Sequence, residues 1–391
     1  MLILLPISKA FSEIAFGVLL ICRLIQWVAA GSRNDSPWSR PALRPLLIAL
    51  AAFLLICALS ITASRWPMLS LRGFIGKWLE YLVLFALAVD LGHRKGVPQR
   101  AMLALACSLV LVFIEIITQE FFDKGIFLGH GYGAYERATG PYENPSDLAT
   151  YLIVVIPSLL CYAVSRRGWL RRGLLALVGT SVVMLARTDA LGAWIGLFVG
   201  LGAVVLMFPR LRRYGALVVV GLMLAVWWMP PQREGHHGTA YRRETFNMNR
   251  LGTTDRVNMW RAAIRMIRDR PILGHGVNTF MANYLDYWVG GERQPRYAHN
   301  CYLQVAAETG LIGAACFLVF LSLLFMEMVV GLRAGLIEHP LWLSGFFAGL
   351  LGFAVQAAGD TNFYAMRQAV LFWTLAGLAV GLCHQPRPDP S

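Results

Sequence analysis

The sequence predicts an all-α polytopic membrane protein with about 11–12 transmembrane helices. Of its 391 residues, 57% are hydrophobic and only 15% are charged, whereas soluble domains carry about 25% charged residues. Apolar runs of roughly 17 to 25 residues, the length that crosses a bilayer as a helix, recur along the whole chain. The runs are continuous rather than alternating, which favours helices over a β-barrel.

The apolar runs give the expected order of the helices. They cover residues 8–30, 45–64, 70–91, 100–120, 145–165, 169–186, 190–208, 213–229, 300–331, 341–358 and 366–383. We expect one integrated membrane domain with three parts: an N-terminal transmembrane bundle (1–229), a large outer loop with short amphipathic helices (230–299) and C-terminal transmembrane helices (300–391). The seven cysteines form no CxxC pair and lie mostly within the runs. They are typical of buried apolar side chains rather than of a metal or disulfide framework.

The formal net charge of +13 could indicate a nucleic-acid partner, but its distribution predicts a membrane topology instead. Basic residues cluster in alternate loops, as cytoplasmic loops do. The clusters are Arg33, Arg40 and Arg44; Arg94, Lys95 and Arg100; Arg166, Arg167, Arg171 and Arg172; and Arg210, Arg212 and Arg213. Segments 121–144, 186–189, 230–299 and 359–365 are then expected on the outer side. We therefore expect contact with membrane lipid and no nucleic-acid partner.

The same alternation places the N-terminus outside with no span before it, which is unusual. A missing or misassigned N-terminal helix is one explanation, and it would raise the number of spans from eleven to about twelve. A cleavable signal peptide is not expected, because the basic n-region and the small-residue cleavage site are both lacking.

Residues 254–270 of the outer loop predict an amphipathic helix. Apolar residues recur at helical spacing at Val257, Trp260, Ile264 and Ile267, while Arg261, Arg265 and Arg268 share another face. Thr253 or Thr254 can cap its start, and Pro271 with the following glycine ends it. We expect this helix to lie in the membrane interface with its arginines solvated. Arg256 would then stand in the first turn.

Three arginines and one histidine on the outer side have the chemistry of transfer from a pyrophosphate donor. Arg137, Arg187 and Arg256 come from separate segments, and His299 stands at the mouth of a span. The planar arginine fork donates paired hydrogen bonds to phosphates and stays charged, and histidine accepts a proton near neutral pH. We expect arginines to neutralise a departing pyrophosphate while the histidine deprotonates a hydroxyl. This predicts glycosyl transfer from a lipid-linked donor, with no metal or other cofactor.

Other functions fit these residues less well. Glycoside hydrolysis ordinarily uses two carboxylates flanking the bond, and no spacing in the outer segments marks such a pair. The chain carries no metal signature, Walker loop or GxSxG motif. Intramembrane carboxylates such as Glu115 keep a transporter of a lipid-linked substrate as an alternative, and a non-catalytic partner in envelope assembly is another. Arg187 can alternatively be an interface arginine paired with Asp189.

Three motifs resemble the O-antigen ligase and polymerase superfamily of bacterial membrane glycosyltransferases, over roughly residues 130–320. ERATGPYENPSDLATYL (136–152) resembles the family's Arg-x-x-Gly segment with an Asn-Pro step into a span. DRVNMWRAAIRMIRDRPILGHGVNTF (255–280) is similar to its Arg, Trp, Pro-x-x-Gly-x-Gly, Phe series. AHNCYLQVAAETGLIG (298–313) is similar to its His-Asn, Tyr-Leu, Glu-x-Gly-x-x-Gly signature. Each motif is weak alone, but the ordered set is specific.

The resemblance implies about twelve transmembrane helices with a large periplasmic loop. It also implies transfer of a glycan from undecaprenyl pyrophosphate, without metal or nucleotide, at the periplasmic face of the bacterial inner membrane. The expected roles are His299 as base, Arg256 and Arg187 as pyrophosphate contacts, and Arg137, Asn300 and Glu308 as substrate contacts. The expected acceptor is a lipid A-core hydroxyl. A polymerase with a glycan acceptor is the close alternative, because the donor chemistry is the same, and a protein acceptor is also open.

Overall fold

The computed structural model describes residues 1–30, 37–122, 124–127, 137–208, 251–291, 293–335 and 337–385. Within these ranges all regular secondary structure is helical, which confirms the predicted all-α polytopic class. Among the described residues, six helices are long and apolar enough to cross a membrane: Pro41–Thr62, Val97–Phe122, Pro145–Val164, Gly168–Arg187, Cys301–Ala334 and Met366–Cys383. Leu191–Met207 and Pro340–Gln356 are shorter apolar helices. The predicted span at 213–229 lies outside the described residues.

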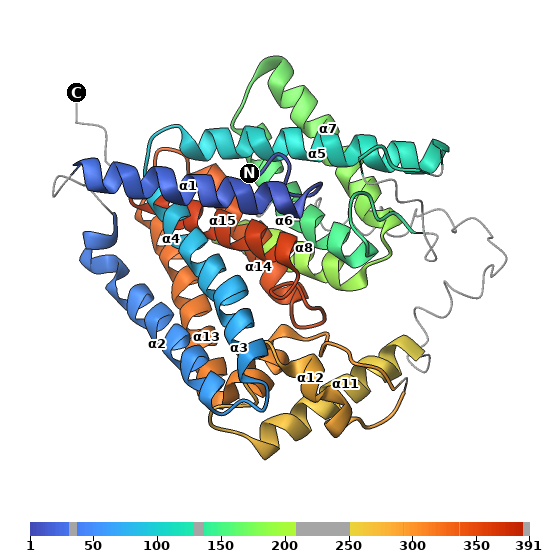
Figure 1. Ribbon diagram of the computed structural model, residues 1–391. Helices are drawn as coiled ribbons and strands as arrows, with labels where there is room; N and C mark the ends of the chain where they lie inside the picture. The colour runs from blue at the N-terminus through green and yellow to red at the C-terminus, as the bar shows by residue number, and fades with distance from the viewer. Residues whose placement is uncertain are drawn as a thin grey trace.

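The described helices follow the predicted spans to within a few residues (Figure 1). They are α1 (Lys9–Ala30), α2 (Arg44–Thr62), α5 (Val97–Phe122), α6 (Pro145–Val164), α7 (Gly168–Arg187), α8 (Leu191–Met207), α13 (Cys301–Ala334), α14 (Pro340–Gln356) and α15 (Met366–Cys383). The run at 70–91 is built from α3 (Pro67–Gly73), the wider π-helical turn η4 (Phe74–Leu79) and α4 (Glu80–Gly92). The short helices η2 (Pro37–Ser39) and η3 (Pro41–Leu43) precede α2.

Close backbone approach at small residues holds the bundle together. Helix α15 packs against α4, and α14 packs against both α6 and α8. A Cβ on Gly377 or Gly381 would lie within 2.4 Å of a carbonyl oxygen of α4, and one on Gly200 within 2.1 Å of the Ala348 carbonyl. Membrane helices associate through such contacts because lipid is as apolar as their side chains. Large apolar side chains such as Ile14 and Val28 on α1 remain exposed, as expected for a lipid-facing surface.

The segments predicted on the outer side are joined to one another at one end of the bundle. The guanidinium of Arg367 donates to the carbonyls of Pro6 and Pro141, both at 2.6 Å. The Ala138 N–H donates to the carbonyl of Arg187 at 3.2 Å. The Cys301 N–H, at the start of α13, donates to the carbonyl at the end of α14. The described parts of the loops before α6, after α7, before α13 and before α15 therefore lie together.

Two of the described basic loops begin at helix ends that contact other helix ends. The His384 ring nitrogen Nε2 lies 2.7 Å from the Glu327 carboxylate, and its carbonyl lies 2.6 Å from Nδ1 of His93. The Trp342 indole N–H donates to the Ser165 hydroxyl at 2.9 Å. The predicted assignment of these loops to the cytoplasmic side stays a prediction.

The outer segment between the spans contains α11 (Leu251–Asp269), α12 (Phe280–Tyr284) and η6 (Leu285–Tyr287). Figure 1 shows α11 and α12 at the bottom of the view, next to the lower ends of α2, α3 and α13. The predicted helix 254–270 exists, but its first residue and its buried face differ from the prediction. It begins at Leu251, so Arg256 lies beyond the first turn.

The buried stripe of α11 also differs from the predicted one. It consists of Met259, Ala262, Ala263 and Met266, whereas Ile264 is 39% exposed. The two alanines have small side chains, so α11 approaches α13 closely on this face. Helical periodicity predicted burial of the larger apolar residues. It does not show where two helices pack so closely that only alanine side chains fit between them.

A break in α13 receives the turn that follows α11. Gly310 has a φ of 71°, which interrupts the helix. The His275 N–H donates to the Ala307 carbonyl at 3.0 Å, and the Gly276 N–H donates to the Glu308 carbonyl at 2.8 Å. In the other direction, the Leu311 N–H donates to the Pro271 carbonyl at 2.7 Å. The Pro-x-x-Gly-x-Gly and Glu-x-Gly-x-x-Gly motifs are therefore two halves of one backbone interface.

We expect Gly310→Ala to destabilise this interface. A Cβ at Gly310 would lie 2.0 Å from the Ile272 carbonyl oxygen, and the φ of 71° is strained for any L side chain. The cost should be at least about 2 kcal/mol, seen as a lower thermal unfolding midpoint of the purified protein. Gly202→Ala is the control, because a Cβ there meets nothing within 4 Å. Equal midpoints for the two variants would contradict this role for Gly310.

Candidate active site

His299 stands in the last step of the chain before α13. Its backbone φ is 45°, a left-handed conformation that non-glycine residues adopt at a cost and that clusters at functional sites. Its Nδ1 atom lies 3.7 Å from Oδ1 of Asp360 and has no hydrogen-bond partner within the described residues. The side chain is 33% exposed. An imidazole is therefore held beside a carboxylate while one side of it remains accessible.

Asp360 comes from the turn between α14 and α15. Its Oδ1 atom accepts a hydrogen bond from the Thr361 N–H at 2.8 Å, and its carbonyl accepts one from the Cys301 thiol at 3.2 Å. These contacts fix the carboxylate relative to the start of α13. The sequence motifs did not single out Asp360, although it lies in the predicted outer segment 359–365. An acid in the short outer segment between two spans was the available signal.

Asn300 caps α13. Its side-chain oxygen accepts hydrogen bonds from the N–H groups of Tyr302 and Leu303, both at 3.0 Å. This is the usual role of an asparagine at a helix start, where the first N–H groups lack partners in the helix. The side-chain oxygen is thus occupied within the protein, and only the amide nitrogen is left for a substrate.

Glu308 is fully enclosed and connects three parts of the site. Its carboxylate accepts hydrogen bonds from the N–H groups of Asn278 and Phe280 at 2.7 and 3.1 Å, and from the Tyr364 hydroxyl at 2.9 Å. Gln304, one turn earlier on α13, adds a fourth donor at 3.3 Å. A buried carboxylate is tolerated when donors surround it in this way. Glu308 therefore holds the start of α12 and the loop before α15 against α13.

Lys77 is a further member of this cluster that the sequence did not indicate. It lies in the π-helical turn η4 and donates from Nζ to the side-chain oxygen of Asn278 at 2.8 Å. Its ammonium also lies 5.9 Å from the centre of the Tyr364 ring.

Tyr297 lies outside the spans, and burial and the nearby Glu308 raise the pKa of its hydroxyl. The Tyr297 hydroxyl therefore stays protonated at neutral pH and can donate.

Arg137 and Arg187 meet at the end of α7. The Arg137 guanidinium donates to the Thr188 carbonyl, at 2.8 Å from Nε. Arg187 forms an ion pair with Glu120 of α5 at 3.1 Å, and its side chain is 46% exposed. The sequence suggested Asp189 as the acidic neighbour of Arg187; Glu120 is a partner that it did not suggest. Arg137 thus braces the helix end from which Arg187 projects.

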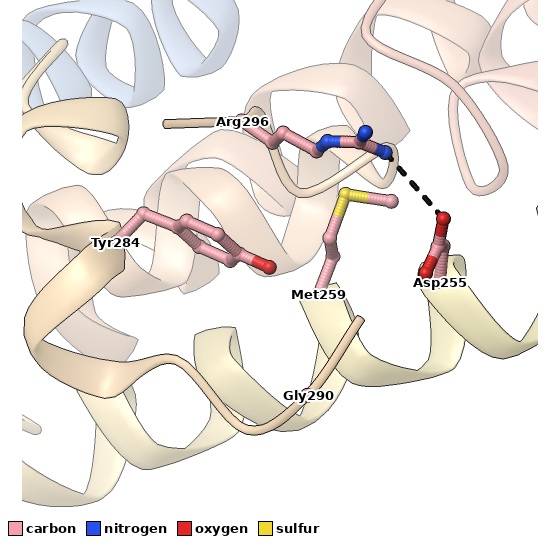
Figure 2. Close-up of a pocket in the computed structure, with 5 residues that line it drawn as sticks. All are labelled: Asp255, Met259, Tyr284, Gly290 and Arg296. Carbon is pink, nitrogen blue, oxygen red and sulfur yellow. Dashed lines mark ion pairs between the residues drawn. The ribbon is translucent and has the colours of Figure 1, made fainter. Parts of the chain in front are cut away.

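Arg256 projects from α11 into solvent, as do the other arginines of this helix, Arg261, Arg265 and Arg268. Its neighbour Asp255 forms an ion pair with Arg296 at 3.6 Å, and Figure 2 shows Met259 and Tyr284 beside this pair. One turn later, the Trp260 indole N–H donates to the His299 carbonyl at 3.4 Å. The loop that carries His299 is therefore tied to α11 near Arg256.

The predicted residues fall into two groups, which α15 and α6 link. His299, Asn300, Glu308 and Arg256 belong to the α11–α13 unit, whereas Arg137 and Arg187 belong to the end of α7. Arg367 binds the Pro141 carbonyl four residues after Arg137. Asp147 of α6 lies close enough to both Arg367 and Asp360 to interact with their charges. Within the described ranges, no group of three His, Cys, Asp or Glu side chains has a metal-binding arrangement.

Comparison with known proteins agrees with the motifs. Residues 174–318 match the model of a family described as O-Antigen ligase, a range that contains Arg187, Arg256 and His299 but not Arg137. A protein of Rickettsia felis, provisionally named a polysaccharide ligase, is 23% identical over 278 residues. The match covers 67% of this chain and 63% of that protein, so the chain spans under two thirds of the relative's length.

These matches confirm the predicted resemblance to the O-antigen ligase superfamily. Together with the apolar helices, they support a multi-pass membrane protein similar to this superfamily.

We expect Glu308→Gln to loosen the contact between α12 and α13. Glutamine keeps the size of the side chain, but its amide group replaces one acceptor oxygen, so at least one of the Asn278, Phe280 or Tyr364 donors loses its partner. A lost bond to a charged acceptor costs about 1.5–3 kcal/mol. Amide exchange at Asn278 and Phe280 should therefore quicken about tenfold or more. Glu338→Gln, at an exposed acid far from this contact, should leave the exchange unchanged. Equal exchange in both variants would rule this role out.

Proposed function

We propose that this protein transfers a glycan from undecaprenyl pyrophosphate to a hydroxyl of the lipid A core, at the periplasmic face of the bacterial inner membrane. The observation that carries the proposal is the placement of His299, an accessible imidazole whose Nδ1 lies 3.7 Å from the Asp360 carboxylate. A carboxylate this close to one ring nitrogen stabilises, by its charge, the cation that forms when the other nitrogen takes a proton. This is the arrangement that a general base requires.

The reaction follows from this arrangement. Nε2 of His299 removes the proton from the acceptor hydroxyl, and the oxygen forms a bond to the anomeric carbon of the donor glycan. The bond from that carbon to the pyrophosphate oxygen breaks, and undecaprenyl pyrophosphate leaves with the electron pair. Arginine side chains stabilise the negative charge that develops on the leaving group.

Arg187 and Arg256 are the proposed contacts to this pyrophosphate. Both guanidinium groups are exposed, and the Arg187–Glu120 pair is a surface ion pair. Such pairs contribute about 0–1 kcal/mol, so Arg187 can exchange Glu120 for a phosphate at little cost. Arg137 adds positive charge and braces the end of α7. Asn300 can offer its amide nitrogen to the substrate. Glu308, with its oxygens already occupied, would act by positioning α12.

A polymerase of the same family would use the same donor site and accept a second lipid-linked glycan. Only the accepted substrate separates the two reactions. The transporter alternative relied on intramembrane acids such as Glu115, and Glu115 has a structural partner: its carboxylate accepts a hydrogen bond from the Phe127 N–H at 2.9 Å. Anchoring of the segment after α5 accounts for this buried acid without ion transport.

We expect His299→Ala to lower the rate of transfer at least about a hundredfold, the loss typical of removing a general base. The assay uses purified protein, undecaprenyl-pyrophosphate glycan, EDTA and no nucleotide. Core lipid and a lipid-linked repeat unit are offered separately as acceptors. Transfer to core lipid alone supports the ligase, and transfer to the repeat unit alone supports the polymerase.

Two other outcomes of this assay would count against the proposal. If His299→Ala matched an active wild type, the histidine mechanism would be wrong. If the wild type moved glycan to neither acceptor, a transporter or a non-catalytic partner would account better for the protein.

We expect Arg256→Ala to reduce transfer far more than Arg261→Ala. Both arginines are exposed on α11, and the two variants make the same change of charge and of helix propensity. Comparing the variants therefore separates a substrate contact of Arg256 from a general effect of surface charge. Loss of a charged contact to the leaving group should lower kcat/KM about tenfold to a hundredfold. Rates are compared at a fixed, low concentration of donor. Equal losses in the two variants would argue against a specific role for Arg256.

A further inference from the structure

A polar pocket lies beside the candidate active site, and the proposed mechanism does not use it. It opens between the start of α1, the loop before α6 and the start of α15, and water can enter about 80 Å³ of it. Six polar side chains line it: Lys9, Tyr142, Glu143, Asp147, Arg367 and Gln368.

The pocket and His299 share one segment of chain. Asp360 stands beside His299 at the start of that segment, and Arg367 and Gln368 line the pocket at its end. Across the pocket, Asp147 interacts electrostatically with both Asp360 and Arg367. A ligand in the pocket would therefore lie on the Asp360 side of the proposed base.

The walls of the pocket are held in place by the protein's own contacts. Arg367 donates to the Pro6 and Pro141 carbonyls and stacks over the Tyr142 ring at 5.1 Å. Gln368 donates to the Asp147 carbonyl at 3.4 Å. The carboxylate of Asp147, by contrast, makes no hydrogen bond to any residue that the structure describes. This acceptor group is available to a ligand.

The balance of groups suits a neutral, polyhydroxylated ligand. Two basic side chains, Lys9 and Arg367, stand opposite two acidic ones, Glu143 and Asp147, so the pocket lacks the uniformly basic lining that favours a pyrophosphate. Sugar hydroxyls donate and accept together. The carboxylates can accept hydrogen bonds from the sugar hydroxyls, while Lys9 and Gln368 can donate hydrogen bonds to the hydroxyl oxygens. A few fixed polar groups in a concave site are what orient a small ligand.

We propose that this pocket binds the sugar that carries the acceptor hydroxyl and presents that hydroxyl to His299. The inference rests on the proposed glycosyl transfer and adds to it a location for the acceptor. The donor pyrophosphate would bind the exposed arginines of α7 and α11. The acceptor sugar would occupy the pocket of mixed acidic and basic side chains, where its hydroxyls rather than its phosphates are recognised.

The direct test is binding in the absence of donor, with core oligosaccharide released from lipid A as the probe. Saturation-transfer NMR on the purified full-length protein should show sugar signals for the wild type and for the control Glu338→Gln. The signals should fall at least about tenfold in Asp147→Asn, the effect of losing a charged acceptor. Ala365→Phe, which fills the pocket from its lining, should remove them. Equal signals in all four proteins, or no signal in the wild type, would overturn the inference.

The transfer assay distinguishes failure of this inference from failure of the proposed function. In an active enzyme, Asp147→Asn should raise the KM for the acceptor at least tenfold and leave the KM for the donor within threefold. An unchanged acceptor KM would overturn the pocket assignment while the glycosyl transfer stands. Sugar binding that depends on Asp147 in a protein without any transfer activity would instead overturn the proposed function and leave the pocket as a sugar site.

Discussion

The break in α13 at Gly310 is the constraint on which the arrangement of the site depends. A continuous helix would satisfy its own carbonyl groups, whereas the interruption leaves those of Ala307 and Glu308 to accept from the turn after α11. The same break presents the Glu308 carboxylate to the start of α12 and to Tyr364. A polar segment is thereby fastened to an apolar bundle through backbone hydrogen bonds, which tolerate little displacement.

The position of His299 follows from this attachment. Helix α11 lies against α13 through small side chains, and its Trp260 holds the His299 carbonyl. The first turn of α13 is tied to the end of α14, which leads directly into Asp360. The imidazole and the carboxylate therefore approach each other because three helix ends converge, and neither side chain alone defines the site. Strain at the His299 backbone is maintained by these surrounding contacts.

The sequence identified the arginines of the candidate site but did not predict the contacts that each of them makes. A basic residue on the outer side of a membrane protein is conspicuous, so Arg137, Arg187 and Arg256 were all identified. Their different uses were not visible, because a guanidinium that binds a carbonyl and one that projects into solvent look the same in a sequence. The acids and cations that complete the site lie at helix starts (Asp147 and Arg367), in a turn between spans (Asp360) or within an apolar run (Lys77). Their roles can be recognised only from their contacts with residues that are distant in the chain.

The sequence by itself determined the helical class and the positions of the described spans, because the length and hydropathy that a bilayer requires act on each segment separately. It also marked the glycines and the His-Asn step of the motifs. Only the tertiary structure decided which face of α11 is buried, that Glu308 accepts hydrogen bonds from the protein's own backbone, and that a polar pocket forms between Asp147 and Arg367. These features arise from close approach between distant segments, and such approach depends on packing that no single segment encodes.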